Sequence, residues 1–238
     1  MIARYAGGSS GAKRAARSGA IVVVVDAYRA SATIAVLVSK RARVIPLSSV
    51  EAARIHPADF RVGERDGAKV EGFDFGNTPT GILAAGDLPP GTTVAMTTTN
   101  GTRIVEAASG SPAIIIGSFV NAGAVSKDVF ERLKEGESSE VVVVGCGWRG
   151  RRTSEDEAAS AAILLRLRKA GVPLDERAER VVADHLKRFA KSLRNNDAAR
   201  RLKRLGYGED LEFCLKEDTV PVVPVLTDGA FVAHSGYQ

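Results

Sequence analysis

The chain has 238 residues, of which 45% are hydrophobic and 26% are charged, the composition of a globular protein with one large or two small domains. No apolar run approaches the roughly 18 residues that cross a bilayer, and residues 1–19 lack the apolar core of a secretory signal. Cys146 and Cys214 lie too far apart in the sequence to indicate a disulfide framework or a zinc site. We therefore expect a cytoplasmic protein with no membrane partner.

The net charge of +5 would be compatible with a nucleic acid as a partner. Many basic residues lie between Arg166 and Arg204, however, where acidic residues interrupt them, as on a solvated helical face. The chain has four Tyr, eight Phe and one Trp, and it shows no aromatic platform among its basic residues on which bases could stack. We expect no nucleic acid partner, and the charge favours a small anionic substrate.

Short apolar runs alternate with helical patterns along the chain, which predicts an α/β fold. The expected strands cover residues 20–25, 44–47, 60–63, 92–96, 113–116 and 140–144, with a final strand or two over 220–226. The expected helices cover residues 31–39, 50–54, 104–108 and 154–170, with Ser154 as an N-cap, and another ends near Lys134. One or two basic helices are expected over residues 176–205. Pro221 and Pro224 predict that the last strand lies at a sheet edge. We expect one unit over residues 1–238, with 135–145 as the place where two subdomains would meet.

The first of these strands leads into the segment that carries the most information. Four valines, residues 22–25, run into Asp26, and Arg29 follows three positions later. An unbroken valine run is typical of a strand buried on both faces, and a carboxylate at its carboxyl end lies where open α/β sheets bind ligands. The alternative is that Asp26 caps the next helix and that Arg29 is solvated on its first turn.

A second polar segment follows the strand at 92–96 and is typical of a phosphate site. Hydroxyls and backbone N–H groups at a strand-to-helix turn face an anion placed there, a glycine allows close approach, and an arginine adds a bidentate donor. The segment consists of Thr97, Thr98, Thr99, Asn100, Gly101, Thr102 and Arg103. The alternative is an ordinary turn at Asn100 and Gly101 with Thr102 as a cap.

Acidic residues at the ends of different strands indicate a metal. Asp26 follows the first strand, Glu64 begins the long polar stretch 63–80, and Glu155 and Asp156 open the helix at 154–170. Hard oxygen ligands near a phosphate suit Mg²⁺, which one or two carboxylates usually hold together with waters and phosphate oxygens. The alternative for the last two acids is that they complement the helix dipole.

Cys146 offers another route to phosphate chemistry. With Arg152 and Thr153 it has the spacing by which cysteine-dependent phosphatases hold phosphate, with the thiolate as nucleophile. Gly145 stands where those enzymes have a histidine, and in an arginine-rich chain the spacing is common. A metal-assisted route is therefore favoured.

Taken in order, these segments resemble the 2-phosphosulfolactate phosphatase family, the ComB-like proteins of coenzyme M biosynthesis. The resemblance runs from about Ala20 to Phe231. The matching motifs are Asp26-x-x-Arg29-Ala30-Ser31-x-Thr33, Gly63-Glu64-Arg65-x-Gly67, Glu71-Gly72-Phe73-Asp74-x-Gly76-Asn77, Thr97 to Arg103, Gly117-Ser118-Phe119-x-Asn121-Ala122, Ser154-Glu155-Asp156, and, near the C-terminus, Leu205-Gly206-Tyr207-x-Glu209-Asp210-Leu211-x-Phe213-Cys214. Two features depart from the family pattern: Tyr28, where a leucine is usual, and the basic turn Trp148 to Arg152, which would fit a different anionic substrate or a stronger hold on a sulfonate.

The resemblance implies a three-layer α/β/α ComB-like fold and a Mg²⁺-dependent phosphatase that releases (R)-3-sulfolactate and phosphate. On this interpretation Asp26 binds the metal together with Glu155 or Asp156, and it also attacks phosphorus or acts as a ligand alone. The other expected site residues are Glu64 as general acid/base, Arg65 as a clamp for a carboxylate or sulfonate, Arg29, Arg103 and Thr97 to Thr102 on the phosphate, and Ser118 and Asn121 in substrate binding. A homodimer, a cysteine-dependent phosphatase and a non-catalytic basic binding protein that uses residues 166–204 stay open.

Overall fold

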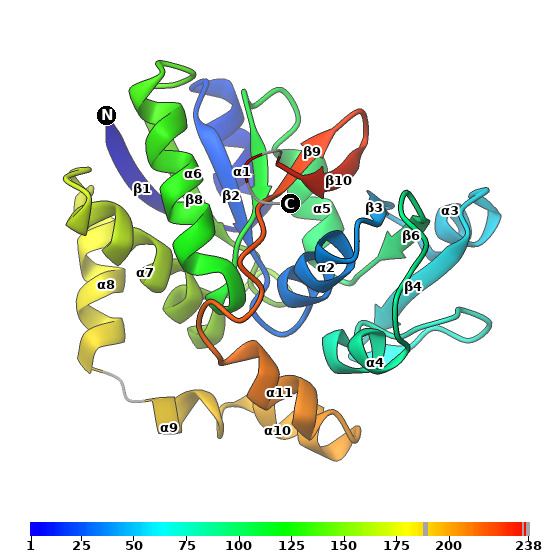
Figure 1. Ribbon diagram of the computed structural model, residues 1–238. Coiled ribbons are helices and arrows are strands. Elements are labelled where there is room, and N and C mark those ends of the chain that lie inside the picture. The colour runs from blue at the N-terminus through cyan, green and yellow to red at the C-terminus, as the bar shows by residue number, and fades with distance from the viewer. Residues whose placement is uncertain (188–189, 235, 237–238) are drawn as a thin grey trace.

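In the computed structural model, which describes residues 1–187, 190–234 and 236, strands and helices alternate around one mixed sheet (Figure 1). The strands are β1 (Ile2–Gly7), β2 (Ile21–Val25), β3 (Arg43–Pro46), β4 (Phe60–Arg65), β5 (Ala68–Lys69), β6 (Thr93–Thr97), β7 (Ile114–Ile116), β8 (Glu140–Gly145), β9 (Pro224–Thr227) and β10 (Ala230–Ala233). The helices are α1 (Gly8–Arg17), α2 (Ala30–Ser39), α3 (Val50–Ile55), α4 (Pro79–Ala84), α5 (Gly101–Ala107), the 3₁₀ turn η1 (Phe119–Asn121), α6 (Ala122–Lys134), α7 (Ser154–Lys169), α8 (Glu176–Lys187), α9 (Ala190–Leu193), α10 (Asp197–Arg204) and α11 (Gly208–Cys214).

The unbroken valine run of β2 has a direct cause, because apolar cores cover both faces of the strand. Val22 and Val24 belong to the core that includes residues of α1, α2 and α5. Val23 and Val25 belong to the core formed with α6, α7 and α8. These two helical layers around the sheet confirm the predicted three-layer α/β/α fold.

The sheet consists of two parallel halves joined by a hairpin. Its strand order is β1-β8-β2-β7-β9-β10-β3-β6-β4-β5. Strands β1, β8, β2 and β7 are parallel to their neighbours, as are β3, β6 and β4. The β9–β10 hairpin pairs antiparallel with β7 on one side and with β3 on the other.

The prediction of an edge for the last strand is therefore wrong. The two prolines do not prevent an interior place, because Pro221 precedes the hairpin and Pro224 is the first residue of β9. Asp228 and Gly229, with φ of 49° and 76°, form the tight turn that joins β9 to β10. This short hairpin brings the C-terminal part of the chain into the middle of the sheet.

Helix α2 lies between the two halves. Residues 30–38 are all buried, since the sequence of this helix has no charged side chain to give it a polar face. It contacts β3, β7, β9 and β10 as well as α4. The chain thus leaves Asp26 at the end of β2 and passes directly into the centre of the molecule.

Several local features differ from the sequence predictions. Residues 1–19 contain β1 and α1, and the stretch 63–80 contains β5 and the start of α4, where Thr78 accepts from the backbone N–H of Gly81 and Pro79 is the first helical residue. The N-cap of α7 is Thr153, not Ser154. The basic segment predicted at 176–205 holds α8, α9 and α10, and its residues 188 and 189 lie outside the described part. Within the described part, no helix has the length and apolar character needed to cross a membrane.

Candidate active site

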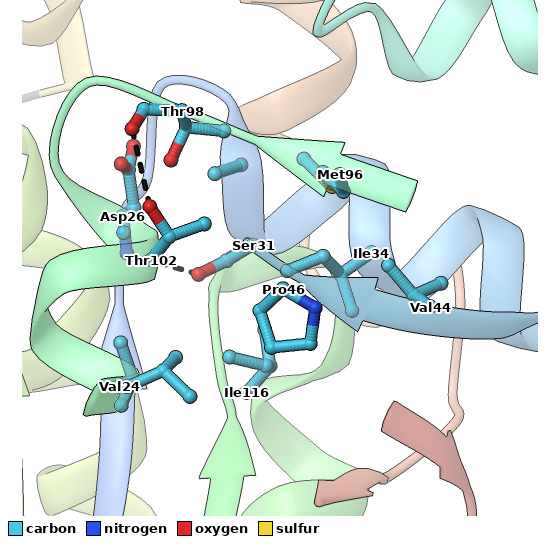
Figure 2. Close-up of a pocket in the computed structure, with 13 residues that line it drawn as sticks. Val24, Asp26, Ser31, Ile34, Val44, Pro46, Met96, Thr98, Thr102 and Ile116 are labelled. Carbon is cyan, nitrogen blue, oxygen red and sulfur yellow. Dashed lines mark hydrogen bonds between the residues drawn. The ribbon is translucent and has the colours of Figure 1, made fainter. Parts of the chain in front are cut away.

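Asp26 is half-buried at the carboxyl end of β2, and its carboxylate points toward Thr98 and Thr102 (Figure 2). Its backbone N–H donates to Ser31 Oγ over 2.9 Å. The carboxylate accepts the backbone N–H of Ala30, and within the described residues no side chain hydrogen-bonds to it. A Cβ on Gly101 would lie 3.6 Å from Asp26 Oδ2, so the start of α5 reaches the acid closely.

The pKa of the Asp26 carboxyl lies well above its ordinary value. Burial is the main cause, and repulsion by Asp156 and then by Glu64 adds to it. A carboxylate at such a position gains from any cation or hydrogen-bond donor brought to it. Perturbed acids of this kind concentrate at functional sites.

The threonine turn between β6 and α5 supplies hydroxyls without partners. The Oγ1 atoms of Thr98 and Thr99 are buried and have no hydrogen-bond partner within the described structure. Thr102 Oγ1 donates to the backbone oxygen of Thr98 over 3.2 Å (Figure 2). Arg103 is exposed and makes no ion pair with any described residue. Buried hydroxyls normally find partners, so two unpartnered ones on adjacent residues, with Thr98 lining the same pocket as Asp26, indicate a polar ligand.

Glu64 links this turn to the β4–β5 turn. Its Oε1 accepts the backbone N–H of Thr99 and its Oε2 accepts that of Gly67, both over 2.7 Å. The side chain is buried. Glu64 therefore holds two loops together, while its role as general acid/base stays a prediction.

Asp156 ties the loop after β8 to the end of β2. Its Oδ1 accepts the backbone N–H of Ala27 over 2.8 Å. Its Oδ2 accepts the N–H of Gly147 over 2.8 Å and the hydroxyl of Thr153 over 2.7 Å. Burial raises the pKa of Asp156 in spite of these bonds. The side chain positions the residue next to Asp26 and has little free capacity for a metal.

Glu155 retains more freedom. Its Oε2 accepts from Asn196 Nδ2 over 2.7 Å. Burial and then the charge of Asp156 raise the pKa of Glu155 to about 7. Asn196, the N-cap of α10, was missed from the sequence, although an asparagine directly before a charged helix is a recognisable capping signal.

The four acids do not form a complete metal site by themselves. Within the described chain, no group of three or more His, Cys, Asp or Glu side chains has an arrangement that could hold a metal ion. Asp26 feels the charges of Asp156, Glu64 and Glu155, however, so negative charge does gather here. Mg²⁺ needs only one or two carboxylates when waters and phosphate oxygens complete its shell. The open carboxylate of Asp26 fits that smaller set.

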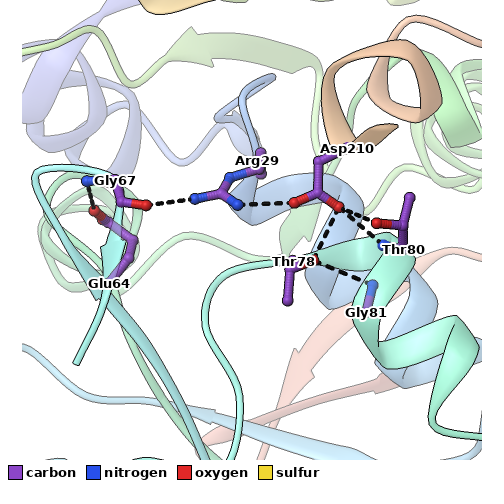
Figure 3. Close-up of polar contacts among 7 residues, drawn as sticks. All are labelled: Arg29, Glu64, Gly67, Thr78, Thr80, Gly81 and Asp210. Carbon is purple, nitrogen blue, oxygen red and sulfur yellow. Dashed lines mark hydrogen bonds and ion pairs between the residues drawn. The ribbon is translucent and has the colours of Figure 1, made fainter. Parts of the chain in front are cut away.

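The sequence analysis expected Arg29 either on the phosphate or in solvent, but the structure places it in a buried network with Asp210 (Figure 3). It is 1% exposed, so the alternative of a solvated Arg29 is wrong. Its Nη1 pairs with Asp210 Oδ2 and its Nη2 donates to the backbone oxygen of Gly67, both over 2.8 Å. Its guanidinium carbon lies 3.9 Å from the centre of the Tyr207 ring. Both terminal nitrogens are thus engaged by the protein, and phosphate contact stays a prediction.

Asp210 completes this network and was not among the predicted site residues. Its Oδ1 accepts from the Thr78 hydroxyl and from both the backbone N–H and the hydroxyl of Thr80, over 2.6–3.0 Å (Figure 3). It is 1% exposed. A buried arginine requires an acid, but a partner 181 positions away cannot be read from local sequence.

Arg65 and Asn121 hydrogen-bond to other parts of the protein, and the substrate-binding roles predicted for them and for Ser118 stay predictions. Arg65 donates to its neighbour's backbone oxygen over 2.7 Å and to Thr97 Oγ1 over 3.0 Å. Asn121 accepts the backbone N–H of Ser118 and donates to the backbone oxygens of Ile116 and Val222. Both residues are fully buried. Asn121 fixes the segment that enters β9, whereas the Ser118 hydroxyl has no hydrogen-bond partner among the described residues.

Cys146 lies at the end of β8 and is buried. Burial, together with the charges of Asp26 and Asp156, raises the pKa of its thiol well above the ordinary value. A cysteine-dependent phosphatase needs the thiolate. This environment works against that alternative.

The strand ends of this α/β sheet thus carry the open carboxylate of Asp26, two hydroxyls without partners among the described residues, and Arg103. A phosphoric monoester hydrolase works with groups of these kinds. The comparison with known proteins identifies the family. A family model described as 2-phosphosulpholactate phosphatase matches residues 10–229, and the chain belongs to that family, as its motifs predicted.

Individual relatives agree with this assignment. A probable 2-phosphosulfolactate phosphatase of Thermotoga petrophila is 34% identical over 214 residues, which cover 88% of this chain and 90% of that protein. One of Cyanothece sp. is 34% identical over 233 residues, which cover 89% and 91%. One of Clostridium acetobutylicum is 32% identical over 220 residues, which cover 87% and 89%.

Proposed function

We propose that the protein hydrolyses 2-phosphosulfolactate to (R)-3-sulfolactate and phosphate with the help of Mg²⁺. The observation that carries this proposal is the open Asp26 carboxylate close to Thr98, whose hydroxyl, like that of Thr99 next to it in the chain, has no partner among the described residues. The names of the relatives support the choice of substrate. The donor set and the negative charge around Asp26 support the choice of metal.

The chain's own residues divide the work as follows. Thr98 and Thr99 donate their hydroxyl protons to phosphoryl oxygens, which satisfies both groups, and Arg103 supplies positive charge from the same turn. Asp26 holds Mg²⁺, with Glu155, whose side-chain donors Ser154 and Asn196 both reach Oε2, as the second acid. When bound, the ion neutralises the charge of the phosphate group.

Two roles depend on substrate geometry. Asp26 either attacks phosphorus or acts as a metal ligand alone. Glu64, fixed by two backbone N–H groups, is the general acid/base of the proposal, and its rigid position would keep its carboxyl oriented toward the site. A cytoplasmic location and a small anionic phosphorylated substrate are part of the same proposal.

A phosphate-release assay tests the function. The purified protein is given 2-phosphosulfolactate, phospholactate and phosphoglycerate, each with Mg²⁺ or with EDTA. We expect release that depends on Mg²⁺ and is fastest with 2-phosphosulfolactate. Phosphate release should be lost in Asp26→Asn. The control variant Asp87→Asn, which changes a fully exposed carboxylate, should keep it. Absence of release from all three substrates would contradict the proposal.

A further inference from the structure

The loop of residues 147–152, which joins β8 to α7, bridges the two sides of the candidate site. At its start, the N–H of Gly147 is bound by Asp156, the acid that also binds the N–H of Ala27 next to Asp26. At its tip, Arg149 pairs with Asp66 over 3.0 Å, in the turn that follows Glu64. The loop therefore spans from the Asp26 side to the Glu64 side.

The loop carries Trp148, the single tryptophan of the chain, as a platform for two cations. Trp148 and Arg151 exchange backbone hydrogen bonds of 2.8 and 3.0 Å, which fix the hairpin shape of the loop. The guanidinium carbons of Arg149 and of Arg201, from α10, lie 4.5 and 4.4 Å from the indole ring. Stacking on the ring limits where each guanidinium can go.

Arg201 differs from Arg29, Arg65 and Arg149 because no described residue accepts a hydrogen bond from its buried Nε or forms an ion pair with it. Arg29 and Arg65 donate to protein oxygens, and Arg149 is paired with Asp66. Arg201 is half-buried, its Nε is buried without a hydrogen-bond partner, and it forms no ion pair within the described chain. A partly buried guanidinium without an acceptor is costly unless an anion fills the position.

The neighbours of Arg201 place it at the candidate site. Its Nε is 3.8 Å from the position that a Cβ on Gly67 would take, and the Gly67 N–H is held by Glu64. On the other side, its charge lowers the pKa of Glu155 against the larger effect of burial. Arg201 thus lies between the β4–β5 turn and the start of α7.

We propose that Arg201, oriented by Trp148, binds the second anionic group of the substrate, the sulfonate or carboxylate that lies beyond the phosphate. The identity of that substrate rests on the proposed function. The planar guanidinium offers a bidentate donor pair to either group. Arg201 takes the role that the sequence had suggested for Arg65, whose terminal nitrogens are already engaged by protein oxygens.

Trp148 fluorescence gives a readout of this contact that does not need catalysis. We titrate the intact protein with 3-sulfolactate and compare the wild type with Arg201→Gln. Loss of a charge-assisted contact is expected to weaken binding about ten-fold or more. The control is Arg200→Gln, which changes the neighbouring exposed arginine that pairs with Asp197, and it should bind within two-fold of the wild type. Equal binding by wild type and Arg201→Gln would overturn the inference.

Kinetics separate this contact from a general effect on the site. Arg201→Gln should raise KM for 2-phosphosulfolactate about ten-fold and should leave kcat within two-fold. It should not change KM for isopropyl phosphate, which lacks a second acid, whereas an equal rise for both substrates would overturn the inference. Wild-type protein that binds 3-sulfolactate through Arg201 but releases no phosphate would refute the proposed function alone. If the wild type and Arg201→Gln hydrolyse 2-phosphosulfolactate with the same KM and kcat, this inference is refuted and the proposed function is not.

Discussion

Two groups of buried polar residues meet in this molecule, and they differ in whether their hydrogen bonds are complete. Arg29 and Asp210 form a closed network in which each charged group has several partners. Asp26 is half-buried, and neither its carboxylate nor the buried hydroxyls of Thr98 and Thr99 have side-chain partners among the described residues. The closed network satisfies its own charges and so contributes to the stability of the fold, whereas in our proposal the open group binds the substrate.

The largest effect is expected from the open group. Asp26→Asn removes the carboxylate, so phosphate release from 2-phosphosulfolactate should fall about 10³-fold. Because a buried, repelled charge is also removed, the free energy of unfolding should stay equal or rise. Initial rates and urea unfolding check the two halves of this prediction, and an active Asp26→Asn protein would remove Asp26 from the chemistry.

The closed network should respond in the opposite way. Asp210→Asn leaves Arg29 buried without its counter-charge, so unfolding should become easier by about 3–5 kcal/mol. Urea denaturation measures this loss. Asp197→Asn, at an exposed ion pair, is the control and should change the free energy by less than about 0.5 kcal/mol. Similar small losses in both variants would mean that the buried pair does not stabilise the fold.

The pH dependence of stability comes next in size. The pKa of Asp26 is raised and that of Glu155 is raised to about 7, so between pH 4 and 7 the folded state binds more protons than the unfolded state. The free energy of unfolding should therefore fall as pH rises through this range, by about 1–3 kcal/mol. Mg²⁺ should restore stability at pH 8 more than at pH 5. Melting curves with Mg²⁺ or EDTA measure this, and equal shifts at both pH values would contradict a metal at these acids.

Two threonine variants sharpen the comparison at the level of single hydroxyls. Thr98→Val removes a hydroxyl without a partner, and kcat/KM should fall about ten-fold with little change in stability. Thr92→Val removes a hydroxyl that donates to the Pro89 backbone oxygen over 2.6 Å. That variant should lose about 1 kcal/mol of stability and keep its activity. Kinetics and unfolding curves of both proteins decide whether the distinction holds.

The smallest effect is expected at Cys146. The buried thiol has a strongly raised pKa, so Cys146→Ser should keep kcat/KM within two-fold. Loss of activity in this variant, with resistance of the wild type to EDTA, would revive the cysteine-dependent mechanism.

What could be predicted from the sequence is local. The β2 valines with Asp26 and the threonine turn were found because one strand and the turn after it carry the whole pattern. The Arg29–Asp210 pair and the interior place of the β9–β10 hairpin could not be found, because they join segments more than 100 positions apart. Arg201 could not be singled out, because it is one of several arginines in α10, whose sequence indicates a solvent-exposed helix.

The most direct measurement compares kcat per folded molecule for Asp26→Asn and Asp210→Asn with 2-phosphosulfolactate. The fraction of folded protein is taken from the unfolding curve of each variant under the assay conditions. We expect Asp26→Asn to be folded and inactive, while the folded part of Asp210→Asn keeps a kcat near that of the wild type. An active Asp26→Asn protein, or folded Asp210→Asn protein as inactive as Asp26→Asn, would contradict this division of roles between the two groups.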